Sequence, residues 1–440
     1  MNLRPDTRIF LLTTIALTCC LGNESFAQSH LTEAILQAVD KVQPNVLEWR
    51  RDIHQHPELS NREFRTAALV AAHLESLGIE TTAGIAHTGV VGILRGGKPG
   101  PVVALRADMD GLPVVERTDV PFKSTIMSEY NGEQVGVMHA CGHDTHVAIL
   151  MGVAEVLAGM RDELPGAVKF IFQPAEEGAP RAEEGGAELM VKEGVLDYPA
   201  VDAAFALHID ALTPVGTLTY NPGGTFASSD DVQIIVRGRQ AHGAFPWMGA
   251  DPVVASAQII AALQTVISRN HPVLESAAVV TIGTIRGGVR HNIIPEEVTM
   301  TGTVRALDPQ LRLEIHEDIR RIATNVAVGM GVTAEVKLPL TRATPVTYND
   351  PELTEAMAPA LIEAAGAENV SVRKPETGGE DFAFIAEKVP SFYFILGGKP
   401  LGVAASEVAD HHTPDFFVDE AALPLGVKAM VAVALRYLNQ

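Results

Sequence analysis

Three short apolar runs in the first half of the chain each lead into side chains that can bind a metal, and this pattern constrains the fold most. Runs rich in Val, Leu and Phe are typical of buried strands. Parallel strands of an open α/β sheet end at one edge, where such sheets carry their sites. We therefore predict an α/β fold with a site at that edge. The runs and their following residues are 102–106 before Asp108, 167–172 before Glu176 and Glu177, and 203–207 before His208.

Residues 138–146 read Met-His-Ala-Cys-Gly-His-Asp-Thr-His. Cys, His and Asp are the groups that bind a borderline-soft divalent metal. Cys141 and His143 are two positions apart, so an extended backbone would point both side chains the same way. We expect Thr145 to cap a helix over 146–160. The stretch is interpreted as a metal-binding turn, and a polar turn without metal is the alternative.

Glu176 and Glu177 are adjacent carboxylates that repel each other unless a cation lies between them or one is protonated. Neighbours on an extended chain point to opposite sides. One carboxylate can then bind a metal while the other acts as a general base. Two solvated loop carboxylates are the alternative, and Asp108 alone is equally consistent with a turn residue.

A chain of 440 residues is too long for one ordinary domain, and its hydrophobic share of 47% is ample for a buried core. The net charge of -21 argues against a nucleic-acid partner, because phosphate binding needs clustered Lys and Arg. After the N-terminus, no stretch looks long and apolar enough to span a membrane.

The N-terminus is typical of a signal peptide over residues 1–27. Arg4 and Arg8 precede an apolar run at 9–21 that is too short for a stable membrane anchor. Ser-Phe-Ala, ending at Ala27, resembles a cleavage site. We expect an exported chain, periplasmic or secreted, that begins at Gln28.

Of the three cysteines, Cys19 and Cys20 lie in this signal, so the mature chain keeps only Cys141. An exported chain with one cysteine forms no internal disulfide, and a free thiol is open to oxidation. Cys141 is more easily explained as a metal ligand than as a small buried residue. A lipid anchor on Cys20 is the alternative to cleavage, although the residues before it fit that pattern poorly.

The pattern of elements changes near residue 225. Strands and helices there follow the order β-α-β-β-α-β, which is the ferredoxin-like split motif. We predict an inserted domain over 225–340 between two parts of a catalytic domain, 28–224 and 341–440. The expected strands are 232–236, 279–285, 298–304 and 332–338, and the expected helices begin at Pro252 and Pro309.

Taken together, these motifs resemble the M20 metallopeptidase family. They are most similar to its amidohydrolase branch, which includes hippurate, N-acyl-amino-acid and auxin-conjugate hydrolases. The resemblance spans about residues 42–437. It implies a dinuclear-zinc-exopeptidase-like α/β catalytic domain with an inserted ferredoxin-like lid and dimerisation domain. The motifs are Arg-Ala-Asp-Met-Asp at 106–110, His-Ala-Cys-Gly-His-Asp at 139–144, Gln-Pro-Ala-Glu-Glu-Gly at 173–178 and Ala-Leu-His at 206–208.

The resemblance implies a site for two divalent metals per subunit. Glu176 matches the general base that takes a proton from metal-bound water. Asp108 resembles a residue that orients a metal ligand without contacting the metal itself. Cys141 favours zinc, but a site rich in His and Glu also accepts manganese, nickel or cobalt. The implied ligands are Cys141 as the bridge, with His143, Glu177, His208 and His412 as terminal ligands.

In the inserted domain, the resemblance implies three substrate-binding side chains. His242 matches a lid histidine that stabilises the oxyanion, often in the partner subunit, and this implies a homodimer or higher oligomer. Asn292 and Arg305 match groups that hold a free carboxylate, a task suited to a guanidinium. Gly378 and Gly379 resemble the backbone part of that pocket.

One position departs from the family pattern. Many relatives carry a second histidine where this chain has Trp247. Trp247 follows Phe245 closely, so the pair could reshape an apolar acyl pocket, which is a hypothesis.

The expected activity is metal-dependent hydrolysis of N-acyl amino acids, aromatic acyl groups included, that have a free carboxylate. A carboxypeptidase or dipeptidase acting on short peptides is the nearest alternative. A non-catalytic periplasmic binder of metal or peptides is the alternative of another class. Glu176 argues against the binder, which needs no base beside Glu177.

Overall fold

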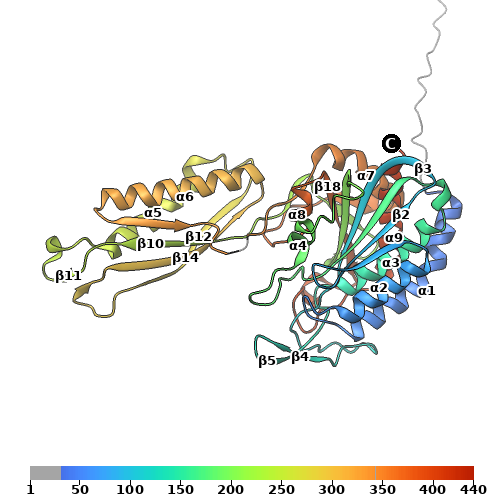
Figure 1. The fold of residues 1–440 in the computed structure, drawn as a ribbon, viewed down its shortest axis with the longest axis horizontal. Coiled ribbons are helices and arrows are strands. Elements are labelled where there is room, and N and C mark those ends of the chain that lie inside the picture. The colour runs from blue at the N-terminus through green and yellow to red at the C-terminus, as the bar shows by residue number, and fades with distance from the viewer. Residues whose placement is uncertain (1–30, 342) are drawn as a thin grey trace, which may run out of the picture.

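The computed structural model describes residues 31–341 and 343–440, which form a larger and a smaller lobe (Figure 1). The predicted signal at 1–27 lies outside the described residues. The larger lobe is an α/β sandwich and the smaller lobe is α+β, so the predicted fold class is confirmed.

An eight-stranded sheet forms the centre of the larger lobe, in the order β1-β2-β6-β3-β7-β18-β8-β17. β3 runs parallel to both β6 and β7, and β18 runs parallel to β7. The carboxyl ends of these four central strands therefore meet at one edge. The strands are β1 Glu80–Ile85, β2 Gly89–Arg95, β3 Lys98–Asp108, β6 Pro165–Gln173, β7 Ala203–Pro214, β8 Leu218–Tyr220, β17 Val370–Val372 and β18 Ser391–Lys399.

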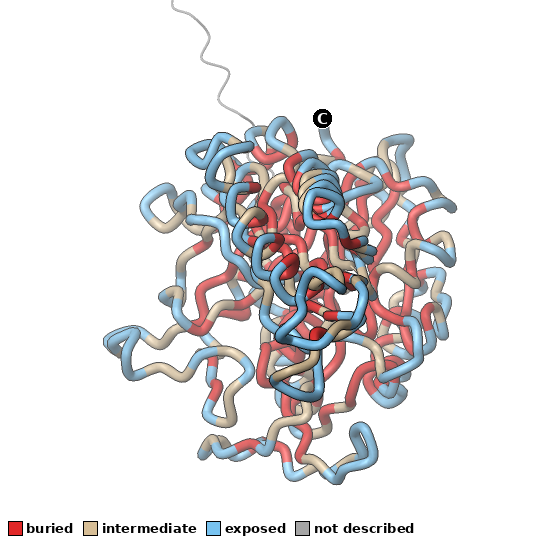
Figure 2. The backbone as a smooth tube through the Cα atoms, turned by 90° about the vertical axis from the view of Figure 1, so that its left-hand side faces the viewer, coloured by how far each residue is buried: buried red, intermediate tan, exposed pale blue. Residues whose placement is uncertain are grey.

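Helices cover both faces of this sheet. One face carries the larger apolar core, in which α3 lies between α1 and α9 (Figure 1). The other face carries a smaller core under α4 and α8. Buried residues lie at the middle of the molecule and exposed residues on the outer loops (Figure 2). The helices are α1 Glu33–Gln55, α2 Phe64–Ser76, α3 His143–Ala158, α4 Gly186–Lys192, α7 Pro351–Ala365, α8 Ala383–Ala386 and α9 Leu423–Leu438.

The smaller lobe is an antiparallel sheet in the order β12-β14-β10-β15, packed against two helices. The order along the chain is β-α-β-β-α-β, as the sequence predicts. The limits at 225 and 340 stay predictions. The elements are β10 Asp230–Arg237, α5 Pro252–Asn270, β12 Ala278–Gly287, β14 Glu297–Ala306, α6 Pro309–Gly329 and β15 Thr333–Lys337.

Short strand pairs complete the described structure. β9 Gly223–Phe226 pairs with β16 Thr347–Asn349, which joins the chain segments on either side of the smaller lobe. A two-residue ribbon, β11 Ala241–His242 with β13 Ile293–Ile294, lies at the far end of that lobe (Figure 1). A hairpin of β4 Met127–Tyr130 and β5 Glu133–Gly136 lies beside the larger sheet.

Three details of the expected elements are wrong. The helix expected from residue 146 begins at His143, because Gly142 adopts a left-handed φ of 96° and ends the preceding loop there. Thr145 therefore lies inside the helix and donates its hydroxyl to the Gly142 carbonyl at 2.6 Å. The strand expected over 203–207 continues as β7 beyond His208 to Pro214, because β18 pairs with it there.

Two stretches among the described residues, 252–270 and 420–438, are long and apolar enough to cross a membrane. The expectation that no such stretch exists is therefore wrong by length and composition. The second stretch contains α9, and 67% of it is buried inside the larger lobe, which accounts for its apolar residues. That the chain has no membrane span stays a prediction.

Candidate metal centre

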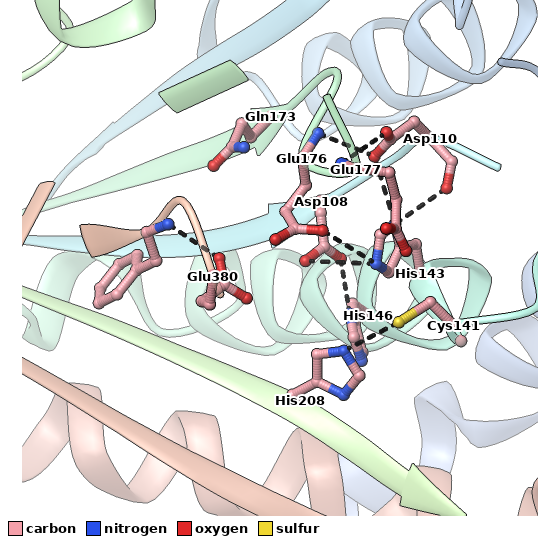
Figure 3. Close-up of polar contacts among 12 residues, drawn as sticks. Asp108, Asp110, Cys141, His143, His146, Gln173, Glu176, Glu177, His208 and Glu380 are labelled. Atoms are coloured by element: carbon pink, nitrogen blue, oxygen red, sulfur yellow. Dashed lines mark hydrogen bonds and ion pairs between the residues drawn. The ribbon is translucent and has the colours of Figure 1, made fainter. Parts of the chain in front are cut away.

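The five predicted ligands converge at the carboxyl edge of the large sheet. Figure 3 labels four of them: Cys141, His143, Glu177 and His208. Cys141 and His143 open α3, Glu177 follows β6, and His208 lies in β7. Donor atoms of Cys141, Glu177 and His412 lie within 4.8 Å of one another, and so do those of His143, Glu176 and Glu177. Cys141 Sγ is 3.3 Å from His208 Nε2. Residues 270 positions apart thus form one cluster of donors.

Hydrogen bonds on the second ring nitrogen identify the histidines that can bind a metal. His143 Nδ1 donates to the Asp110 carbonyl at 2.9 Å, and its buried Nε2 has no hydrogen-bond partner among the described residues. His208 Nδ1 donates to the Ile209 carbonyl at 2.5 Å. Each ring therefore directs an Nε2 lone pair into the cluster, as a ligand must. The donor set of thiolate, imidazole and carboxylate fits a divalent metal such as zinc.

His146 lies near the cluster, but both of its nitrogens are engaged. Nε2 accepts a hydrogen bond from the Ile209 amide at 2.9 Å, and Nδ1 donates to Asp108 Oδ1 at 2.6 Å. Asp108 therefore orients His146, which has no lone pair left for a metal. Asp108 is 3.8 Å from His143 Nε2, too far for a hydrogen bond. The expected role of Asp108 in orienting a metal ligand stays a prediction.

Asp110 contacts the predicted ligand His143. Its side chain is buried, and Oδ1 lies 3.3 Å from His143 Nδ1. The same carboxylate accepts hydrogen bonds from the backbone amides of Glu176 and Glu177, both at 3.1 Å, and from the Ser60 hydroxyl at 2.7 Å. One side chain thus positions a predicted ligand and both glutamates. Asp110 is two positions after Asp108, on the same side of an extended chain, and this signal could have found it.

The two glutamates do not point to opposite sides as expected. An oxygen of each lies within 4.8 Å of the other and of a His143 nitrogen. Ala175 before them has a left-handed φ of 53°, so the chain is not extended there and both carboxylates turn towards the site. Burial, then Glu380 and Glu177, raise the pKa of Glu176 well above its usual range. A bound dication would favour the ionised form of a carboxylate at this position.

Arg106 is a buried cation beside these carboxylates, and no sequence pattern predicted a role for it. Its Nη1 is 2.7 Å from Asp108 Oδ2, and its Nη2 is 2.9 Å from Glu380 Oε1 and 3.2 Å from Asp381 Oδ1. The Asp381 amide in turn lies 3.4 Å from Glu176 Oε1. Arg106 therefore connects β3 to the loop that supports Glu176.

The predicted substrate residues fall into two groups. Gly378 and Gly379 line a cavity of about 750 Å³, which the predicted ligands Cys141, Glu177, His208 and His412 also line. Arg305 in β14 reaches this edge, since a methyl group on Gly379 would lie 4.0 Å from its Nη1. His242 and Asn292 lie instead on or beside the β11–β13 ribbon, at the opposite end of the smaller lobe (Figure 1). One chain therefore does not bring the full set together.

The same ribbon region carries exposed aromatic side chains. Trp247 is 73% exposed and Phe245 is 51% exposed. Their rings meet edge to face at 5.6 Å, and the Phe245 ring is 5.2 Å from that of His242. An apolar surface thus adjoins the predicted oxyanion residue.

A family model described as peptidase family M20/M25/M40 matches residues 104–436. The chain belongs to this family. It is 38% identical over 411 residues to thermostable carboxypeptidase 2 of Saccharolobus solfataricus, covering 93% of this chain and all of the relative. It is 37% identical over 396 residues to the N-acetylcysteine deacetylase of Bacillus subtilis, covering 90% and 97%.

Among solved structures, the chain is similar to the YXEP protein of Bacillus subtilis, a dinuclear metal-binding peptidase of family M20. The identity is 35%, the TM-score is 0.74, and the match covers 91% of this chain and 99% of that one. The predicted family and amidohydrolase resemblance are confirmed. The chain is a metal-dependent hydrolase of amide bonds.

Replacing Arg106 tests whether the buried carboxylates depend on it. In Arg106→Met we expect the free energy of unfolding to fall by about 3–5 kcal/mol, because removing one partner leaves buried charges uncompensated. Arg117→Met is the matched control, since its ion pair with Asp415 is exposed to solvent and contributes little to stability. Urea unfolding followed by circular dichroism measures both. Equal losses in the two variants would contradict the role given to Arg106.

Proposed function

We propose that the chain hydrolyses the amide bond between an acyl group and an amino acid with a free α-carboxylate. The observation that carries this proposal is the convergence of Glu176 with Glu177 and His143 beside a cavity. Glu176 contacts predicted ligands and its backbone amide is held by Asp110, which supports the proposal that it acts as the general base.

The proposed centre holds two divalent ions per subunit, with zinc favoured and manganese, nickel or cobalt as alternatives. Cys141, His143, Glu177, His208 and His412 would hold these ions. When bound, such ions lower the pKa of water and polarise the scissile carbonyl.

Glu176 then accepts the proton of the attacking water at its carboxylate and delivers it to the nitrogen of the leaving amine. The amide of Asp381, 3.4 Å from Glu176 Oε1, helps to keep this side chain turned towards the site. Once Glu176 has accepted this proton, its side chain is a neutral carboxylic acid. Burial favours this neutral form, because burial raises the pKa of Glu176.

Arg305, beside Gly379 at the rim of the cavity, binds the substrate carboxylate through its guanidinium. His242 and Asn292 stabilise the oxyanion and the carboxylate from the far end of the smaller lobe. Their distance from their own metal cluster supports a homodimer in which each chain supplies them to its partner's site (Figure 1). A sedimentation mass equal to one chain in the active enzyme contradicts this arrangement.

Carboxypeptidase or dipeptidase activity is the second candidate, and the likeness to a thermostable carboxypeptidase favours it. The same groups serve both reactions, because both cleave an amide next to a free carboxylate. The occupant of the acyl side alone distinguishes them.

Replacing the general base tests the mechanism. We expect Glu176→Gln to lower kcat by about 10²–10⁴-fold, because the amide cannot accept the proton, while the metal content is unchanged. Amine release from N-acetyl, N-benzoyl and dipeptide substrates is followed in the zinc- and manganese-loaded enzyme. Glu184→Gln, at an exposed carboxylate, is the matched control.

Undiminished hydrolysis by Glu176→Gln would contradict the mechanism. Preference of the wild-type enzyme for dipeptides would favour the peptidase candidate. No hydrolysis of any substrate by a protein that holds two metals per chain would favour the non-catalytic binder.

The exposed aromatic pair is proposed to contact the acyl group. In Trp247→His we expect kcat/KM for N-benzoyl substrates to fall up to about tenfold relative to N-acetyl substrates, because an aromatic contact contributes about 0.5–1.5 kcal/mol. Met248→His, at a neighbouring residue that is 66% exposed, is the control. An unchanged ranking of acyl groups in Trp247→His would contradict the hypothesis.

We further propose that the chain is exported and cleaved after Ala27. N-terminal sequencing of the protein purified from its own cells is expected to begin at Gln28. A mature chain that begins with a lipid-modified Cys20 would support the anchored alternative instead.

A further inference from the structure

His411 directly precedes the predicted ligand His412, and neither the sequence motifs nor the proposed function assigns it a role. It lines the same cavity. Its Nδ1 lies 3.7 Å from Cys141 Sγ, and donor atoms of Cys141, His208 and His411 lie within 4.8 Å of one another. By distance alone, His411 could be a further metal ligand.

The partner of its other nitrogen decides against that role. The Ala211 amide donates to His411 Nε2 at 3.1 Å, so Nε2 presents a lone pair to that N–H group. In a neutral imidazole the proton is then on Nδ1. Asp210 Oδ1 is 3.7 Å from Nε2, too long for a competing hydrogen bond. The atom that faces the cysteine sulfur is therefore an N–H group.

His208 makes the opposite contact with the same sulfur. Its Nδ1–H is used by the Ile209 carbonyl, so the nitrogen 3.3 Å from Sγ is a lone pair. A lone pair beside a thiolate repels it unless a cation lies between them, whereas an N–H group attracts it. The two histidines thus flank Cys141 in different ways, and Phe416, with its ring 4.7 Å from that of His411, packs against the latter.

We propose that His411 is a positioning residue that donates its Nδ1–H to the Cys141 thiolate and does not bind metal. The hydrogen bond holds the sulfur in place and draws electron density from it, so the sulfur donates less electron density to the metals. Residues that hydrogen-bond to a metal ligand commonly have this effect. The inference rests on the proposed metal centre, because a bound metal is what keeps the cysteine as a thiolate.

Cobalt(II) provides a test that does not depend on activity, because the energy of its thiolate charge-transfer band reports the electron density on sulfur. In His411→Ala we expect the full cobalt content of the wild type at saturation, an affinity lowered about 10–100-fold, and a band shifted to longer wavelength. Asn can donate through its side-chain amide from nearly the position of Nδ1. His411→Asn is therefore expected to restore the band towards its wild-type position. His412→Ala is the matched control and should lose cobalt.

Each contrary result has a distinct meaning. If His411→Ala binds one cobalt fewer at saturation while His412→Ala binds the full number, His411 is the ligand and the inference is wrong. If the band is the same in the wild type and in His411→Ala, His411 does not contact the thiolate and the inference is also wrong. If the wild type itself shows no thiolate band with cobalt, the proposed metal centre fails and the inference fails with it.

Discussion

Mutual repulsion among buried carboxylates is the constraint on which the site depends, and Arg106 is the cation that relieves it within the protein. It joins Asp108 on its own strand to Glu380, which lies 274 positions after Arg106. Tyr393 in β18 adds a hydrogen bond to Glu380 at 2.7 Å, so the central strands share one network. The two parts of the larger lobe are therefore connected by charge as well as by the sheet.

Hydrogen bonds away from the site decide what each histidine can do within it. Four histidines lie close together, at 143, 146, 208 and 411, and they are chemically identical in isolation. Backbone carbonyls take the Nδ1 protons of His143 and His208, which leaves Nε2 lone pairs for metal. Backbone amides donate to Nε2 of His146 and His411, which leaves N–H groups. The main chain thus separates ligands from supporting residues.

This division explains how much the sequence could predict. The Cys- and His-rich stretch at 138–146, together with residue type at the ends of buried strands, was sufficient to single out Cys141, His143, Glu177 and His208, because few other groups bind metal. Their donor atoms do converge. Periodicity and turn residues were likewise sufficient for the β-α-β-β-α-β order of the smaller lobe. The sequence predicted no role for Arg106, Asp110 or His411, because their roles depend on partners distant along the chain. The convergence of Glu176 and Glu177 follows from the left-handed Ala175, which no spacing rule reveals.

Under the proposed arrangement, the smaller lobe separates specificity from stability. His242 ends strand β11, and Phe245 and Trp247 follow it closely, at the end of the lobe far from the buried network of Arg106 (Figure 1). An exposed side chain there contributes little to folding, so its replacement is tolerated, whereas the buried network allows almost no change. If this ribbon enters the partner's site, acyl preference can change through Trp247 while the catalytic groups stay as they are. The relatives described above include both a deacetylase and a carboxypeptidase, and under this proposal an exposed side chain at the ribbon is where such a difference in preference would arise.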